Sequence, residues 1–421
     1  MLESRKQERA FLIGVVSGLR GKWEARESFD ELGSLADTAG ALTVGRTMVE
    51  VREISPATFV GRGKVDWLKE EIKRCRADIV IFDGELAPTQ NRNLDEAWGV
   101  RVIDRTSLIL DIFALHAKSR EGKLQVELAQ YQYLYPRLVG AWSHFSRQRG
   151  GNATGGGGVG LRGPGETQLE VDRRRVRERL NRVKRELERV DSSREIHRMK
   201  RQSVPIPTIT LVGYTNAGKS TLFNALSNSS QLVGDKLFAT LDPKTKKIKL
   251  PSGREVLLTD TVGFIRNLPH QLIEAFKSTF EEARKSDMLL HVVDATHPNY
   301  PSQIDVVEKV FEELDLDVIP RIKVMNKMDA EGFRFMGNGA HTIPISATAG
   351  LGLDDLFLMI DRVLAETLSP VKLFLPHPYG QLMASLYTHG RVLHSKNSAR
   401  GVAVEVALPE KWQRKFASYS V

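Results

Sequence analysis

The sequence predicts an α/β protein of several domains, and three observations support this class. Apolar runs of strand length alternate with helical patterns over residues 10–115 and again from about 203 to 369. At 421 residues the chain exceeds what one hydrophobic core usually organises, while 41% apolar residues is ordinary for globular domains. A glycine-containing loop at 213–220 joins a strand to a helix. We expect four parts, the third having a sheet of parallel type: a small α/β domain (1–118), a basic antiparallel helical hairpin (119–202), an α/β domain (203–369) and a small C-terminal domain (370–421).

Composition favours a reducing cytosol. Cys75 is the single cysteine, so no disulfide framework forms within the chain, and no Cys/His spacing is typical of zinc. The apolar run FLIGVVSGL (11–19) follows Glu3 and Glu8 and precedes no small-residue cleavage site, so we interpret it as a buried strand. No apolar stretch reaches the length of a transmembrane segment. We expect a cytoplasmic monomer.

The N-terminal domain shows four strand patterns and three helical ones. The strands are FLIGVVS, ALTVGRTMVEV, ADIVIFDG and GVRVID, and the helices begin near Ala25, Lys64 and Thr89.

Two charged helices with narrow apolar seams follow, from Leu124 to Leu138 and from Leu169 to Val190. Because they are joined in sequence, an antiparallel hairpin is the economical arrangement, with Pro136 bending or interrupting the first arm. Core packing explains the seams fully, so they carry no functional information.

The second arm is strongly basic, with thirteen Lys and Arg against six Asp and Glu over residues 172–201. Such a concentration favours a polyanionic partner over a merely solvated helix face. Between the arms, residues 150–165 hold nine glycines. This segment is either a flexible linker or a probe that orders on RNA, with Arg147, Arg149 and Arg162 supplying charge and stacking planes.

The C-terminal tail opens at Phe374–Pro376 and contains a strand pattern, VAVEVAL (402–408). We expect little core in so short a segment.

The segment GYTNAGKS (Gly213–Ser220) lies between the strand TITLV and the helical TLFNALS, as a phosphate-binding loop requires. Its backbone N–H groups and helix N-terminus attract a β-phosphate, and Lys219 would span the β- and γ-phosphates. The Ser220 hydroxyl is a candidate Mg²⁺ ligand.

A second element follows the strand EVLLT as Asp260, Thr261, Val262 and Gly263, a DxxG motif. Asp260 is expected to hold Mg²⁺ through water, and the Gly263 N–H to reach the γ-phosphate.

A third element selects the base. In IKVMNKMD, Asp329 can accept two hydrogen bonds from guanine, whereas adenine lacks both donors and would leave the carboxylate unpaired at a cost of about 2–5 kcal/mol. Lys327 would lie along the base and Asn326 would brace the loop. At the next strand end, Ser346, Ala347 and Thr348 place backbone N–H groups near the guanine carbonyl. These motifs together indicate a GTP-hydrolysing switch.

The threonine that closes over Mg²⁺ must lie between the phosphate loop and DxxG, where Thr240 and Thr245 compete and Thr240 in LFATLDP is preferred. Regulatory GTPases often carry a water-orienting glutamine directly after DxxG, but this chain has Phe264, so slow intrinsic hydrolysis is expected. Asn216 either helps bind a charge-neutralising K⁺ or merely caps the loop.

These motifs, together with VGRGK, ELAPTQNRNLDEA, RVIDRTSLILDIFALHAKSREGKLQVELAQ and GLRGPGETQLE, resemble the HflX-type GTPases over roughly residues 40–350. The insertion NATGGGG departs from the family's shorter link. With the resemblance, the expected catalytic residues are Lys219, Thr240 and Gly263, and the expected Mg²⁺ residues are Ser220, Thr240 and Asp260. The expected nucleotide contacts are Gly213, Tyr214, Thr215, Asn216, Ala217, Gly218, Lys219, Ser220, Thr221, Phe238, Ala239, Thr240, Leu241, Asp242, Asp260, Thr261, Val262, Gly263, Asn326, Lys327, Met328, Asp329, Ser346, Ala347 and Thr348.

The resemblance implies a cytoplasmic factor that binds the large (50S) ribosomal subunit and its rRNA, and that splits or rescues stalled ribosomes under stress. The ribosome would then stimulate hydrolysis of GTP to GDP. A ribosome-assembly or RNA-remodelling NTPase, or a binding module that only senses GTP, remains an alternative.

Overall fold

The computed structural model divides the chain into two compact units. The first comprises 1–190 with 236–241 and 266–276, and the second comprises 191–235, 242–265 and 277–421. The structure describes residues 7–17, 21–149, 174–190, 206–229, 237–266, 272, 276–335, 339–366, 368–377, 380–398, 400–408, 412–413 and 416–420. Among these residues, none of the helices combines the length and apolar character needed to cross a bilayer.

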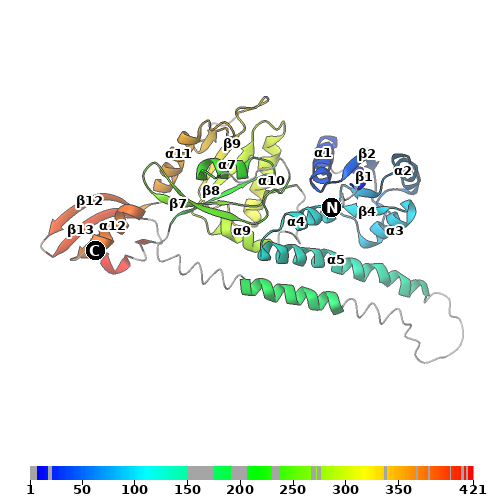
Figure 1. The fold of residues 1–421 in the computed structure, drawn as a ribbon, viewed down its shortest axis with the longest axis horizontal. Helices are drawn as coiled ribbons and strands as arrows, with labels where there is room; N and C mark the ends of the chain where they lie inside the picture. Colours follow the sequence, from blue (N-terminus) through cyan, green and yellow to red (C-terminus); the bar gives the residue numbers. More distant parts are fainter. Residues whose placement is uncertain are drawn as a thin grey trace, which may run out of the picture. The chain divides into compact units, whose positions relative to one another are not determined.

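The N-terminal part of the first unit is a parallel four-stranded sheet in the order β2-β1-β3-β4. Its strands occupy the predicted apolar runs: β1 (Arg9–Ser17), β2 (Leu42–Val51), β3 (Ile79–Phe82) and β4 (Arg101–Asp104). The three expected helices are α1 (Lys22–Thr38), α2 (Arg62–Cys75) and α3 (Pro88–Trp98). Figure 1 labels these elements except β3.

A fourth helix, α4 (Arg105–His116), is present that the sequence pattern did not predict. Its apolar residues cover most of the helix circumference, and Leu108, Ile109, Ile112 and Phe113 are all buried. Because an evenly apolar helix has no polar stripe, periodicity alone does not reveal it. The Asp104 side chain accepts a hydrogen bond from Ser107 N and caps its first turn.

Helix α5 (Arg120–Arg149) and the helix at residues 174–190 lie antiparallel. Side-chain contacts show the opposite directions, because Arg120, Glu127 and Tyr135 of α5 contact, in that order, Glu186, Arg179 and Arg177. Of the two outcomes expected at Pro136, bending or interruption of the first arm, interruption does not occur, since α5 continues through it.

A buried carboxylate fastens α5 to the N-terminal sheet. Asp104, fully buried at the end of β4, accepts hydrogen bonds from Tyr133 OH and from Arg137 Nη2, each at 2.6 Å. The Arg137 guanidinium also stacks on the Tyr133 ring, 3.5 Å from its centroid. Charge-assisted bonds of this kind hold α5 in one orientation on the sheet.

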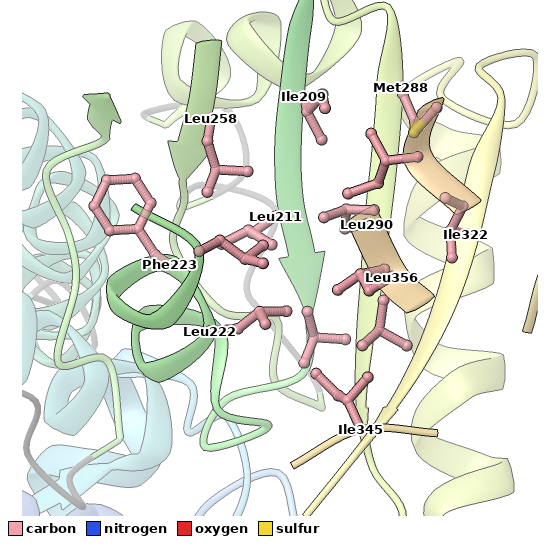
Figure 2. Packing of buried hydrophobic residues seen from close by; sticks show 14 of the residues in the cluster. Ile209, Leu211, Leu222, Phe223, Leu258, Met288, Leu290, Ile322, Ile345 and Leu356 are labelled. Atoms are coloured by element: carbon pink, nitrogen blue, oxygen red, sulfur yellow. The ribbon is translucent and has the colours of Figure 1, made fainter. Parts of the chain in front are cut away.

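The second unit contains a six-stranded sheet in the order β10-β9-β8-β5-β7-β6, parallel except for β6. Its strands are β5 (Thr208–Gly213), β6 (Lys244–Lys249), β7 (Glu255–Asp260), β8 (Met288–Asp294), β9 (Arg321–Asn326) and β10 (Thr342–Pro344). The helices are α7 (Lys219–Ser227), α9 (Lys277–Arg284), α10 (Tyr300–Glu313) and α11 (Leu353–Glu366). Figure 2 shows Leu222 and Phe223 of α7 near Leu211 of β5 and Leu258 of β7, within one buried cluster. This packing fixes α7 at the end of β5.

The C-terminal residues form a three-stranded antiparallel sheet in the order β11-β13-β12. The elements are β11 (Ser369–Pro376), α12 (Gly380–His389), β12 (Arg391–Ser398), β13 (Gly401–Leu408) and the 3₁₀ turn η1 (Ala417–Tyr419). The expectation of little core is wrong, because Leu373, Leu386, Val404, Trp412 and Phe416 belong to one buried cluster. A helix and two late aromatic residues cover a face that the strands alone would leave open.

Candidate nucleotide-binding site

The site lies where the parallel strands of the six-stranded sheet end. Gly213, Asp260, Asp294 and Asn326 are the last residues of β5, β7, β8 and β9. Asp294 is in register with Asn326, and Asp260 with Leu211 near the end of β5. Since carboxyl ends of parallel strands share one edge, motifs far apart in the sequence meet there.

The loop between β5 and α7 surrounds the Lys219 ammonium group. Lys219 is buried, and its Nζ donates to the carbonyl oxygens of Gly213 at 3.1 Å and Tyr214 at 2.7 Å. Burial lowers the pKa of Lys219 to about 8, against the opposing effect of the Asp260 charge. Lys219 lies in the first turn of α7, where a bound anion would favour its charged form further.

Ser220 and Asp260 form a pair of oxygen donors. The Ser220 hydroxyl donates to Asp260 Oδ2 at 2.7 Å, and Asp260 is 1% exposed. A hydroxyl and a carboxylate are the hard oxygen ligands that Mg²⁺ prefers, so the residues fit this ion.

The DxxG segment lies directly on the phosphate loop. Phe264 N donates to Gly213 O at 3.0 Å, and Thr215 N donates to Phe264 O at 2.7 Å. A Cβ at Gly263 would lie 2.7 Å from Lys219 Nζ and 2.9 Å from Thr215 Cα, so only glycine fits. The Phe264 ring is buried and meets Phe311 edge-on, so it points into the core and not toward a reacting water.

Asn326 braces the phosphate loop against the following strand end. Its Nδ2 donates to Ala217 O at 2.9 Å, and its Oδ1 accepts from Ala347 N at 3.0 Å. Gly218 has a φ of 90°, and a Cβ there would come within 2.2 Å of Asn326 Nδ2. The motifs at 213–220, 326–329 and 346–348 thus form one connected structure.

Asp294 is a candidate site residue that the sequence analysis missed. Its Oδ2 pairs with Lys327 Nζ at 2.6 Å, while Oδ1 accepts from both the N–H and the hydroxyl of Thr296. The pair fixes the Lys327 stem, whose backbone has a φ of 67°. An acidic residue at the end of the buried run MLLHVV was the available signal.

The other residues that are expected to contact the guanine base lie around Asn326. Asp329 is exposed, as is Thr348, whereas Ser346 is fully buried and accepts from Ala349 N at 2.9 Å. Met328 N donates to Ile345 O at 3.0 Å. The Asp329 carboxylate is therefore accessible to a ligand beside a fixed backbone.

Two segments of the sequence between the nucleotide motifs pack within the first unit. In 236–241, Leu237 N donates to Thr38 Oγ1 at 3.3 Å, and the Phe238 ring meets Phe113 of α4 edge-on at 4.6 Å between centroids. In 266–276, Arg266 pairs with Glu27 of α1 at 3.0 Å. Phe113 also contacts Phe276, so one α4 ring touches both segments.

Thr240 lies in the first of these segments and is 8% exposed, with Leu241 buried and Ala239 exposed beside it. The structure thus groups Thr240 with the first unit, while Asp242 belongs to the second. Its rival Thr245 lies in β6, and the Thr245 hydroxyl is 3.0 Å from that of Thr259.

Of the arginines proposed for RNA, Arg147 and Arg149 lie in the last turns of α5. Arg162 and the glycine-rich segment 150–165 lie outside the described residues.

Three family models match the chain in succession. They are a GTP-binding GTPase N-terminal region (26–114), a GTP-binding GTPase middle region (116–201) and a 50S ribosome-binding GTPase (208–327). A relative named GTPase HflX from Caldanaerobacter subterraneus subsp. tengcongensis is 46% identical over 99% of this chain and 95% of its own. The chain belongs to the HflX family of GTPases.

Other HflX relatives match at similar levels. GTPase HflX from Escherichia coli K12 is 44% identical over 86% of this chain and 84% of its own. A solved GTP-binding protein from Sulfolobus solfataricus, in complex with GDP, is 25% identical and covers 86% of this chain and 99% of that chain with a TM-score of 0.45.

Proposed function

We propose that this HflX-family GTPase binds GTP at the edge formed by β5, β7, β8 and β9, hydrolyses it to GDP, and uses the cycle to split or rescue stalled ribosomes. One observation carries the nucleotide assignment. Lys219, the Ser220–Asp260 pair and the Asn326 brace meet at one sheet edge although up to 107 residues separate them in sequence.

The loop residues bind and orient the phosphates. Lys219 gives up its carbonyl partners for the β- and γ-phosphate oxygens, and the N–H groups from Asn216 to Ser220 supply the remaining donors. Ser220 and Asp260, with Thr240, would hold Mg²⁺, which neutralises phosphate charge when bound. The Gly263 N–H meets the γ-phosphate because no side chain stands between them.

Guanine selection rests on Asp329, whose exposed carboxylate accepts from the base, and on Lys327, which Asp294 holds in place. Asp294 is thereby a positioning residue for the base.

A bound cation can supply part of the catalytic assistance that a water-orienting glutamine gives in other GTPases and that Phe264 cannot give. Asn216 is exposed at the loop with a φ of 60°. We assign it to K⁺ binding beside the phosphates, and turnover that is equal in potassium and sodium salts would exclude this role.

We infer that the nucleotide state acts on the segments 236–241 and 266–276, which belong to the first unit. GTP would hold the loops around Thr240 and Gly263, and the adjoining contacts of Phe238 and Arg266 with α4 and α1 would change with that state. The basic hairpin, with Arg147, Arg149 and Arg162, would contact rRNA of the large subunit in the cytoplasm, with the chain acting as a monomer.

The deciding experiment measures GTP turnover and pelleting with purified large ribosomal subunits. We expect GTP-dependent pelleting and faster hydrolysis, and on sucrose gradients a loss of intact ribosomes that requires GTP. The Lys219→Ala variant should lose nucleotide binding, whereas Lys309→Ala, an exposed lysine on α10, should not. A turnover rate unaffected by large subunits would refute the ribosomal role.

The alternative function, ribosome assembly or RNA remodelling, gives a different gradient profile. The chain would then migrate with immature particles, and intact ribosomes would persist in the presence of GTP.

A further inference from the structure

The C-terminal sheet has one covered face and one open face. Leu373, Val404 and Leu386 of α12 lie in the core on the covered side. Residues that alternate with these core positions form the open face, among them Lys372 and Phe374 of β11, Ala403 and Glu405 of β13, and His394 and Lys396 of β12. Lys372, Ala403, His394 and Lys396 are exposed, so this face meets solvent in the second unit.

This part of the chain is strongly basic. Residues 369–421 contain seven Lys and Arg against two Asp and Glu, and Glu405 is the one acidic residue in the three strand sequences. This excess of positive charge gives the region an attraction for polyanions.

The strand register arranges the open face in two rows. Lys372, Glu405 and His394 are direct cross-strand neighbours, and so are Phe374, Ala403 and Lys396. Neighbouring β-strands lie about 4.8 Å apart. The ammonium groups of Lys372 and Lys396 are therefore both within reach of one extended ligand that lies across the sheet. Because the Ala403 side chain is small, the middle of the second row projects little from the sheet.

An aromatic ring lies on this face. A Cβ at Gly401 would come within 3.0 Å of Phe374 Cζ, so the ring of Phe374 lies over the glycine backbone. Covering a strand glycine is a structural role, and it also holds the ring fixed on the face, beside the row that contains Lys396. A fixed ring beside cations is the arrangement on which bases stack while phosphates pair with lysine.

We propose that the open face of the C-terminal sheet binds single-stranded RNA, with Phe374 stacking on a base and Lys372 and Lys396 pairing with phosphates. An acidic peptide would bind through the lysines but not through the ring. If the edge-strand lysines only prevent aggregation, neither the lysines nor the ring would bind a ligand. The proposal goes beyond the proposed function, because it requires neither GTP nor the hairpin.

The experiment uses the full chain and a short uridine-rich oligoribonucleotide that carries 4-thiouridine. Irradiation should cross-link peptides from 369–376 or 391–408, a readout that the basic hairpin does not affect. In the double variant Lys372→Gln/Lys396→Gln we expect these cross-links to fall about tenfold. When affinity is measured from the cross-links, the plot of log affinity against log salt concentration should become less steep by about 1.4.

Two further variants test the ring. Phe374→Leu keeps an apolar side chain over Gly401 and should weaken cross-linking about tenfold, since the stacking of a base on the ring is lost. Phe374→Tyr should retain it. Thermal unfolding and GTP turnover without RNA should be unchanged in all variants, which separates this proposal from the proposed function.

The control for charge is Lys249→Gln/Lys309→Gln, two exposed lysines on β6 and α10. Equal loss in this control, cross-links only outside 369–408, or displacement by polyglutamate with Phe374→Leu behaving like the parent would each overturn the proposal. The last outcome would point to an acidic protein partner.

Discussion

At the scale of single residues, Gly263 has the strictest steric requirement in the candidate site. Its missing side chain leaves room for Lys219 Nζ and for the Thr215 backbone. In Gly263→Ala the methyl group displaces the ammonium and presses on the Thr215 backbone, so we expect GTP turnover to fall at least about tenfold and the melting temperature to fall as well. Gly21→Ala, at a position with no atom within 4 Å of the new Cβ, is the matched control, and full turnover in Gly263→Ala would contradict the assignment.

His291 predicts how stability depends on pH. It is 1% exposed on β8, and burial, with Lys323, Arg321 and Lys219 nearby, lowers its pKa to about 3. Glu308, 3.9 Å away, does not offset these effects. Because the unfolded pKa is about 6.5, protonation favours the unfolded chain, and stability is lost as pH falls from about 6.5 toward 3.

The slope of this loss approaches about 1.4 kcal/mol per pH unit for one group. We expect His291→Gln to lower the melting temperature at pH 7.5 but to flatten its decline between pH 6.5 and 4.5. If the melting temperatures of parent and variant decline equally with pH across that range, another group controls acid stability.

At the scale of elements, α1 and α4 hold two segments. The segment 236–241 contains Thr240, and the segment 266–276 follows the DxxG motif. The Arg266–Glu27 pair is largely buried, with side chains 12% and 16% exposed. In Glu27→Gln we expect several-fold weaker stimulation of GTP turnover by large subunits, because the 266–276 segment is held less firmly, while GDP affinity stays within about twofold. Glu24→Gln removes the same charge from an exposed position of the same helix and should behave like the parent. Unchanged stimulation in Glu27→Gln would exclude this coupling.

At the scale of the whole molecule, two compact units with separate cores should not unfold as one. A ligand stabilises only the state that binds it, by about 2.7 kcal/mol at a hundredfold excess over its dissociation constant. We expect calorimetry to show two transitions, of which GDP with Mg²⁺ raises chiefly the one that belongs to the second unit. A single transition, or an equal rise in both, would show that the units unfold together.

The sequence by itself determined the α/β class, the four strands of the N-terminal sheet, the strands that carry the nucleotide motifs, and the identity of those motifs. These features depend on local alternation and on short spacings, which the chain carries without reference to its partners. The same reasoning found Lys219, Asp260 and Asn326 but not Asp294, because a single acid at a strand end has no motif around it.

Only the tertiary structure decided which separated residues meet. It paired Lys327 with Asp294, turned Phe264 into the core, and grouped the segment of Thr240 with α1 and α4. It also revealed the buried helix α4, the uninterrupted α5 and the core of the C-terminal sheet. Each of these depends on contacts between residues distant in sequence, and such contacts override local propensity because burial and pairing contribute more free energy than propensity does.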